Sequence, residues 1–303
     1  MPHDQTSTSA KPARSDAIGI LHRAKQSAKV LFNLRRLPKP LSLEEQVYAE
    51  VVRDGDVCFD IGANVGWIAL FLARTAGPTG KVIAFEPVWP TYMTMCANIQ
   101  NTINVKAPIL TMPFGLAEEE KAATIHVPDG RFEFGTLVQP DELTRLYPQM
   151  RLAQYDCRFM SLDGFLRTKD RLVADFWKLD VEGAELLVLR GASEHFAAGH
   201  RPLIAAEVYA PWQQRFGYSP WEFFAPLLSW GYRFFFLCPG GLIDHLPSES
   251  APFPAEFEHG YNVLAHVPER HGERMRGLKR LRFGTGRALT VARGLYPNRP
   301  LQF

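Results

Sequence analysis

The chain has 303 residues, of which 46% are hydrophobic and 22% are charged. This mixture can supply a full hydrophobic core, and it excludes a wholly disordered chain or a fibrous repeat. No apolar run reaches the roughly 18 residues that a membrane-spanning helix needs, and the N-terminal segment lacks the apolar core of a secretory signal. We therefore expect a cytoplasmic protein.

The net charge of +2 conceals an uneven distribution. Residues 1–40 carry eight Lys or Arg against two acidic residues, and residues 269–303 carry nine against two. The residues between them carry 17 basic and 28 acidic side chains, a net charge of −11. The basic ends could contact an anionic membrane surface, a phosphorylated substrate or nucleic acid, or they could fold back onto the acidic body or stay solvated.

The N-terminal region reads as an extension of the main domain. Residues 1–13 are rich in Ser, Thr and Pro, and we expect them to be disordered. Residues 14–34 have the mixed apolar and basic pattern of a weakly amphipathic helix, and residues 37–41 read as a linker. Ser42 is followed three residues later by Glu45, a spacing that predicts a capped helix running to about Arg53.

From Asp56 onward, strand-like runs alternate with helical patterns, which is typical of β-α-β units around a parallel sheet. The expected strands are 57–61, 81–86, 107–112, 176–180, 202–208, 232–237 and 261–267, and the last two are expected as an antiparallel addition at the sheet edge. The expected helices are 65–76, 90–101, 183–192 and 219–230. Residues 118–173 break the alternation and predict an inserted β-ribbon or lid.

These patterns predict an α/β fold with a mostly parallel, seven-stranded sheet that carries an antiparallel edge strand. The expected organisation is a basic N-terminal extension over 1–42, a main domain over 43–268 and a basic C-terminal tail over 269–303. The four cysteines are far apart and form no C-x-x-C pair, so we expect reduced thiols.

The first chemical signal is D-I-G-A-N-V-G, which runs from Asp60 to Gly66 between the first strand and its helix. Gly62 and Gly66 allow a sharp turn and a close approach of a ligand to the main chain. Asn64 lies midway between them, and the spacing differs from the G-x-G-x-x-G of nicotinamide sites. A carboxylate at the strand end would repel a pyrophosphate and favour a cationic ligand, such as an ammonium or a sulfonium.

The second signal is Glu86, which ends the second strand in A-F-E-P and lies 24 residues beyond Gly62. That spacing is close to the roughly 20 residues expected for a carboxylate that binds ribose hydroxyls. Pro87 prevents the strand from running directly into a helix and fixes the turn.

The third signal is W-K-L-D-V-E-G-A-E, residues 177–185. If the strand extends far enough, Lys178, Asp180 and Glu182 point to one face, at the carboxyl end where open α/β sheets bind ligands. Glu207, near the end of the next expected strand, adds a carboxylate to the same rim. A structural ion pair combined with a helix cap would also explain Glu182 and Glu185.

These motifs, together with S-L-D-G-F-L at 161–166 and P-L-I-A-A-E at 202–207, resemble the FkbM family of S-adenosylmethionine-dependent methyltransferases. The resemblance spans residues 56–208, and L-D-V-E-G-A-E is its most specific block. It implies a class I methyltransferase sandwich with the methyl donor over the first two motifs. The residues expected at the donor are Asp60, Gly62, Asn64, Gly66, Glu86 and Pro87, with Phe114 and Gly115 where such folds cradle adenine.

The resemblance implies transfer of a methyl group to a hydroxyl of a glycan, a glycolipid or a secondary metabolite. An alcohol needs a base, and Asp180 could serve, with Glu182 and Glu207 beside it as further catalytic residues. Alternatively, Asp180 with Glu182 or Glu207 could hold a magnesium ion that acidifies the hydroxyl. The sequence leaves both routes open.

Several other interpretations remain. Aromatic residues after the fifth expected strand, at positions 209, 212, 216, 218 and 221, and at 132–134 in the insert, could stack on an acceptor or pack the loops. Histidines 126, 195 and 200 lie outside the motifs and are expected on surfaces or loops. The rival functions are a non-catalytic donor-binding protein, a nucleic-acid methyltransferase suggested only by the basic ends, and a nicotinamide oxidoreductase.

Overall fold

A computed structural model describes residues 41–128, 151–169, 172–238, 241–255 and 260–278. All of them belong to the second of two units into which the chain divides, Leu41–Phe303. The expected N-terminal helix at 14–34 and the aromatic stretch at 132–134 lie outside the described residues. None of the helices in the described ranges is both long and apolar enough to cross a membrane.

The first described helix, α2 (Leu43–Val51), begins where the sequence predicts it. The Ser42 hydroxyl accepts the N–H of Glu45 at 3.1 Å, and the Glu45 carboxylate accepts the N–H of Ser42 at 2.8 Å. This reciprocal pair satisfies two N–H groups that the start of a helix leaves free. Val47, Tyr48 and Val51 then form the buried face of the helix.

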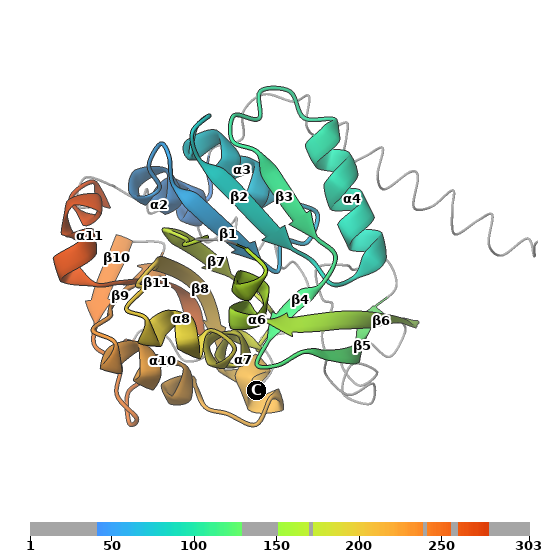
Figure 1. The fold of residues 1–303 in the computed structure, drawn as a ribbon. Coiled ribbons are helices and arrows are strands. Elements are labelled where there is room, and N and C mark those ends of the chain that lie inside the picture. The colour runs from blue at the N-terminus through green and yellow to red at the C-terminus, as the bar shows by residue number, and fades with distance from the viewer. Residues whose placement is uncertain (1–40, 129–150, 170–171, 239–240, 256–259, 279–303) are drawn as a thin grey trace, which may run out of the picture. The chain divides into compact units, whose positions relative to one another are not determined.

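The main sheet has eight strands in the order β10-β9-β11-β8-β7-β1-β2-β3 (Figure 1). In chain order these are β1 (Val57–Ile61), β2 (Lys81–Phe85), β3 (Ile109–Met112), β7 (Phe176–Leu179), β8 (Leu203–Tyr209), β9 (Arg233–Cys238), β10 (Gly241–His245) and β11 (Gly260–His266). β3, β2, β1, β7 and β8 pair in parallel, so their carboxyl ends meet at one rim. This confirms the mostly parallel α/β sheet.

Two details of the sheet differ from the expectation. The sheet has an eighth strand, β10, which pairs antiparallel with β9 and forms the antiparallel edge. β11 is not at an edge, because it lies between β8 and β9 and is antiparallel to both. Pairing between distant strands is set by non-local contacts, so the spacing of strands along the chain does not show their order in the sheet.

Helices cover both faces of the main sheet. Besides α2, the structure contains α3 (Trp67–Thr75), α4 (Trp89–Gln100), α6 (Leu162–Arg167), α7 (Glu185–Arg190), α8 (Ser193–Ala197), α9 (Ala210–Arg215), α10 (Pro220–Ser229) and α11 (Pro268–Met275). The segment expected as one helix over 183–192 forms only α7, and α8 follows it. α6, α8, α9 and α11 have no counterpart among the expected helices.

Strand alternation divides the buried side chains of the main sheet between two cores, one on each face. Phe59, Ile61 and Trp177 face the core that α6, α7, α8 and α10 cover. Cys58 and Phe176, each one position away along the same strands, face the core that α2, α3, α4 and α11 cover. This period of two is the expected one for strands that are buried on both faces.

The predicted insert contains a β-ribbon, which belongs to a second sheet of order β4-β6-β5. β5 (Lys121–Pro128) and β6 (Leu152–Ser161) pair antiparallel over their length, and β4 (Gly115–Ala117) pairs in parallel with the end of β6. Figure 1 shows this sheet beside the carboxyl ends of β2 and β3.

Candidate active site

The candidate site is built where the carboxyl ends of β1, β2, β7 and β8 come together. The turn after β1 is tightly constrained. Gly62, Asn64 and Gly66 have φ values of 84°, 50° and 86°, in the left-handed region that glycine adopts without strain and that asparagine tolerates better than most other residues. A Cβ on Gly62 would lie 1.9 Å from the carbonyl oxygen of Asp180. The glycine at position 62 therefore lets the ends of β1 and β7 approach each other closely.

Glu86 lies at the end of β2 and is held by that turn. Its Oε2 accepts the N–H of Asn64 at 3.0 Å, and its Oε1 accepts the N–H of Val88 at 2.8 Å. The side chain is buried, and burial raises the pKa of Glu86 to about 7 although the two N–H groups act in the opposite direction. Each oxygen retains an acceptor site for a hydroxyl, so the geometry suits the predicted ribose role.

Asp60 and Lys178 lie on adjacent strands and are register partners. Asp60 is 1% exposed, and its Oδ2 has no hydrogen-bond partner among the described residues. Burial raises the pKa of Asp60 to about 7, the charge of Lys178 lowers it, and the charge of Asp180 raises it further. Burial alone would lower the pKa of Lys178, but the charges of Asp180 and Asp60 raise it above its usual value.

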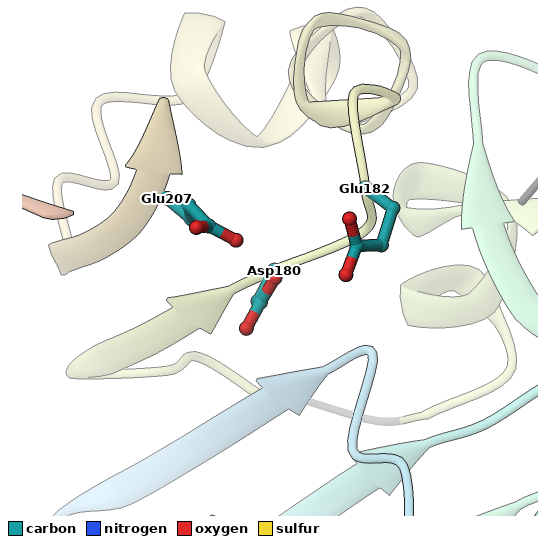
Figure 2. A group of neighbouring side chains, drawn as sticks. All are labelled: Asp180, Glu182 and Glu207. Carbon is teal, nitrogen blue, oxygen red and sulfur yellow. The ribbon is translucent and has the colours of Figure 1, made fainter. Parts of the chain in front are cut away.

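Asp180, Glu182 and Glu207 form one cluster (Figure 2). Carboxylate oxygens of the three residues lie within 4.8 Å of one another. Figure 2 shows Glu207 on β8 pointing toward the loop that carries the other two. The Asp180 carboxylate also accepts a hydrogen bond from Nζ of Lys178 at 2.7 Å.

Glu182 joins this cluster through a turn, and not through the extension of the strand that the sequence allowed. β7 ends at Leu179, and Glu182 has a φ of 52°, in the left-handed region. The chain therefore turns at Glu182, and no strand alternation connects it to Asp180. The turn still brings the two carboxylates together, beside Glu207.

The residues predicted to cradle adenine lie after β3. Phe114 is half-buried and packs its ring against Phe85 and Phe165, with ring centres 5.8 and 6.0 Å away. Gly115 is buried in β4, where a Cβ would lie 2.5 Å from the ring of Phe159 and 3.4 Å from Pro87. The adenine role of these two residues stays a prediction.

Two of the aromatic candidates for stacking on an acceptor are buried. Trp212 and Tyr218 are 7% and 5% exposed, so both pack inside the protein. Tyr209 and Phe216 are half-buried, and Tyr209 lies on β8 two residues beyond Glu207. His195 is also buried, at 5% exposure, which contradicts the surface placement expected for it.

The sequence indicated Tyr218 only as an aromatic residue that could stack on an acceptor or pack the loops, and Glu185 only as part of an ion pair combined with a helix cap. Both side chains are buried and contact the loop that carries Asp180 and Glu182. Glu185 belongs to the L-D-V-E-G-A-E block, which is the one signal that pointed to it. Tyr218 lies 33 residues further along the chain, and no local pattern connects it to that block.

The strand order β3-β2-β1-β7-β8-β11-β9, with β11 antiparallel, is that of a class I methyltransferase fold, and the acidic rim lies at the carboxyl ends of its parallel strands. The sequence model of the Methyltransferase FkbM domain matches residues 60–234, more than half of the chain. The chain therefore belongs to the FkbM methyltransferase family.

Two curated relatives are similar over part of their length. The chain is 27% identical over 156 residues to "Methyltransferase 1" of Beauveria bassiana, an alignment that covers 46% of this chain and 60% of the relative. It is 25% identical over 205 residues to "AMB antimetabolite synthetase AmbE" of Pseudomonas aeruginosa, covering 54% of this chain and 9% of that protein. The chain thus spans less than two thirds of either relative.

Solved structures show a more distant likeness. The methyltransferase FkbM of Methylobacillus flagellatus is 16% identical with a TM-score of 0.41, over 73% of this chain and 50% of that one. The O-methyltransferase of Bacillus cereus, solved in complex with SAH, is 13% identical with a TM-score of 0.41, over 84% of this chain and 92% of that one.

The residues present fit S-adenosylmethionine, which is a cation bearing a sulfonium and an ammonium group. The buried Asp60 oxygen without a partner and the surrounding carboxylates supply negative charge at the carboxyl ends of β1 and β7. Glu86 offers acceptors for two hydroxyls at the end of β2. The ammonium of Lys178 opposes this charge, and it is paired with Asp180.

Proposed function

We propose that the protein is an O-methyltransferase whose acceptor is a hydroxyl of a glycan, a glycolipid or a secondary metabolite. The observation that carries the proposal is the cluster of Asp180, Glu182 and Glu207, whose oxygens lie within 4.8 Å of one another beside the candidate donor site. A hydroxyl becomes a good nucleophile for methyl transfer only when its proton is removed, and a carboxylate can accept that proton.

The donor, when bound, supplies a methyl group on a positively charged sulfur. The residues proposed to hold it are Asp60, Glu86 and the turn from Gly62 to Gly66, with Pro87, Phe114 and Gly115 near the adenine. Asp180 is the proposed base, and Glu182 and Glu207 help to orient the acceptor hydroxyl. The chain's contribution is to hold the acceptor oxygen in line with the methyl group and to exclude water.

The same three carboxylates could bind a magnesium ion, because hard oxygen ligands suit that ion. Such an ion, when bound, would acidify the acceptor hydroxyl. The proximity of Lys178 to Asp180 favours the metal-free route, since the ammonium at 2.7 Å already neutralises part of the charge available to a cation.

The experiment is a screen for acceptors. The full chain is incubated with S-adenosylmethionine and panels of hydroxylated glycans, glycolipids and polyketide-like alcohols, and formation of S-adenosylhomocysteine is measured with magnesium and with EDTA. We expect turnover with at least one hydroxylated class, and a loss of about 100-fold or more in Asp180→Asn. Turnover that appears only with amine acceptors would contradict the proposal.

Nucleic acid is the rival acceptor, and the charge of −11 between the basic ends argues against it. Salt-dependent binding of mixed oligonucleotides, followed by their methylation, would favour this rival. We also propose that the basic ends can contact an anionic membrane surface. The cytoplasmic location likewise stays a proposal.

A further inference from the structure

The loop between β7 and α7 carries two of the three clustered carboxylates in an uncommon conformation. Glu182 has a φ of 52° and Gly183 a φ of 102°, so two consecutive residues occupy the left-handed region. For a glutamate this conformation is unfavourable, and it persists only where surrounding groups hold the backbone in place.

Glu185 holds the loop from the helix side. Its Oε1 accepts the N–H of Gly183 at 3.0 Å and the N–H of Val181 at 3.3 Å. These two N–H groups belong to the residues on either side of Glu182. Glu185 is 2% exposed, so water does not compete for the bonds.

Tyr218 holds the same loop from a different element. Its hydroxyl donates to the carbonyl oxygen of Gly183 at 2.6 Å and accepts the N–H of Leu186 at 3.3 Å. The hydroxyl oxygen also lies 3.3 Å from Oε2 of Glu185. Glu185 and Tyr218 thus contact each other as well as the loop.

The position of Tyr218 in the chain gives this contact its importance. Tyr218 follows α9, which follows directly from β8, the strand that carries Glu207. α9 packs closely against the loop, because a Cβ on Gly183 would lie 2.8 Å from the backbone of Trp212, which belongs to α9. The hydroxyl of Tyr218 therefore connects the segment that carries Asp180 and Glu182 to the segment that follows Glu207.

We infer that Glu185 and Tyr218 are positioning residues, which hold the Asp180–Gly183 loop so that the carboxylates of Asp180 and Glu182 stay beside that of Glu207. The pair acts on the backbone on both sides of Glu182, and neither side chain belongs to the carboxylate cluster. The expected effect of the two residues on kcat rests on the proposed function, whereas their expected effect on the conformation of the loop does not.

The test measures amide hydrogen exchange at single residues in the full chain. Tyr218→Phe leaves Glu185, the direct partner of the Val181 and Gly183 amides, in place. We expect these two amides nevertheless to exchange at least about tenfold faster in Tyr218→Phe. Glu185→Ala should likewise accelerate exchange of Leu186, whose direct partner is Tyr218. Glu185→Gln keeps an acceptor oxygen and should exchange like the wild type.

The matched control is Tyr232→Phe. The Tyr232 hydroxyl is buried and donates to the carbonyl oxygen of Pro202 at 2.8 Å, away from the loop. This variant loses a similar hydrogen bond and should leave exchange at Val181, Gly183 and Leu186 unchanged. If Tyr218→Phe accelerates only Leu186, or if Tyr232→Phe has the same effect on the loop, the inference is overturned.

A second arm connects the loop to catalysis. With an acceptor from the screen, Tyr218→Phe and Glu185→Ala should lower kcat about tenfold or more, while the Kd for S-adenosylmethionine stays unchanged and Glu185→Gln restores kcat. An unchanged kcat in both variants would overturn the positioning role. If the wild type binds no S-adenosylmethionine, or no acceptor is found, the proposed function loses its support and the exchange measurements alone decide the inference.

Discussion

Gly62 and Gly199 have almost the same φ, 84° and 85°, but very different surroundings. A Cβ on Gly62 would lie 1.9 Å from the carbonyl oxygen of Asp180, whereas a Cβ on Gly199 would have nothing within 4 Å. The two residues therefore separate the cost of the left-handed conformation from the cost of a backbone collision.

We expect Gly199→Ala to lower the free energy of unfolding by about 1 kcal/mol, because only the conformational cost applies. Gly62→Ala adds displacement of the β1 turn from the end of β7, so a loss of more than about 3 kcal/mol is expected. Urea unfolding of both variants measures the difference. Equal losses would show that the close approach of Gly62 to Asp180 contributes nothing to stability.

Glu185 makes stability depend on pH. Burial raises its pKa from the ordinary value of 4.5 to about 7, so the folded state binds the proton more tightly than the unfolded state does. The resulting stabilisation is fully present below about pH 4.5 and is lost as the pH rises to about 7. Asp60 and Glu86, whose pKa values are also raised to about 7, act in the same direction.

The free energy of unfolding of the wild type should therefore fall between pH 5 and pH 8. In Glu185→Gln we expect this fall to be smaller by up to about 3 kcal/mol, since the amide does not ionise. Urea unfolding at several pH values provides the measurement. Glu119→Gln, on an exposed residue next to β4, is the control and should leave the curve unchanged. A Glu185→Gln curve parallel to that of the wild type would refute the assignment.

Helix α11 packs against α2, and both helices lie outside the residues that match the family model. Arg274 on α11 forms a two-pronged ion pair with Asp56, just before β1, and also donates to the carbonyl oxygen of Val51 at 3.2 Å. The Arg274 and Asp56 side chains are 17% and 6% exposed. The ion pair therefore holds α11 against the residues that precede β1.

Arg274→Ala leaves the Asp56 carboxylate buried without its cation. We expect the free energy of unfolding to fall by about 3 to 5 kcal/mol, which is typical of breaking a buried pair by removing one partner. Adding Asp56→Asn should recover part of the loss, and a double-mutant cycle measured by urea unfolding tests this coupling. Additive losses from the two substitutions would contradict it.

Local signals predicted several elements correctly. The capping pair Ser42 and Glu45, the glycine turn after β1 and the position of Glu86 all depend on neighbouring residues, and all were visible in the sequence. α11 was missed because its charged sequence reads as a tail, and its buried His271 and Met275 are revealed only by packing against other elements.

In the whole molecule, non-local contacts determine the features of the fold and of the site that the sequence did not predict. The place of β11 inside the sheet and the pairing of Tyr218 with Glu185 each depend on segments that meet only in the folded protein. The family and its donor were accessible because the residues that carry them lie in short motifs at strand ends. The acceptor was not accessible, because none of these short motifs points to one acceptor.

We expect the rim of the sheet to bind S-adenosylmethionine with Glu86 on the ribose. Calorimetric titration of the full chain tests it most directly, with S-adenosylmethionine and NAD as separate ligands and with Glu86→Ala and the exposed Glu119→Ala as variants. We predict that the wild type and Glu119→Ala bind S-adenosylmethionine and not NAD, and that a folded Glu86→Ala binds it at least about tenfold more weakly. Absence of S-adenosylmethionine binding by the wild type, or binding of NAD in its place, would contradict this assignment of the donor site.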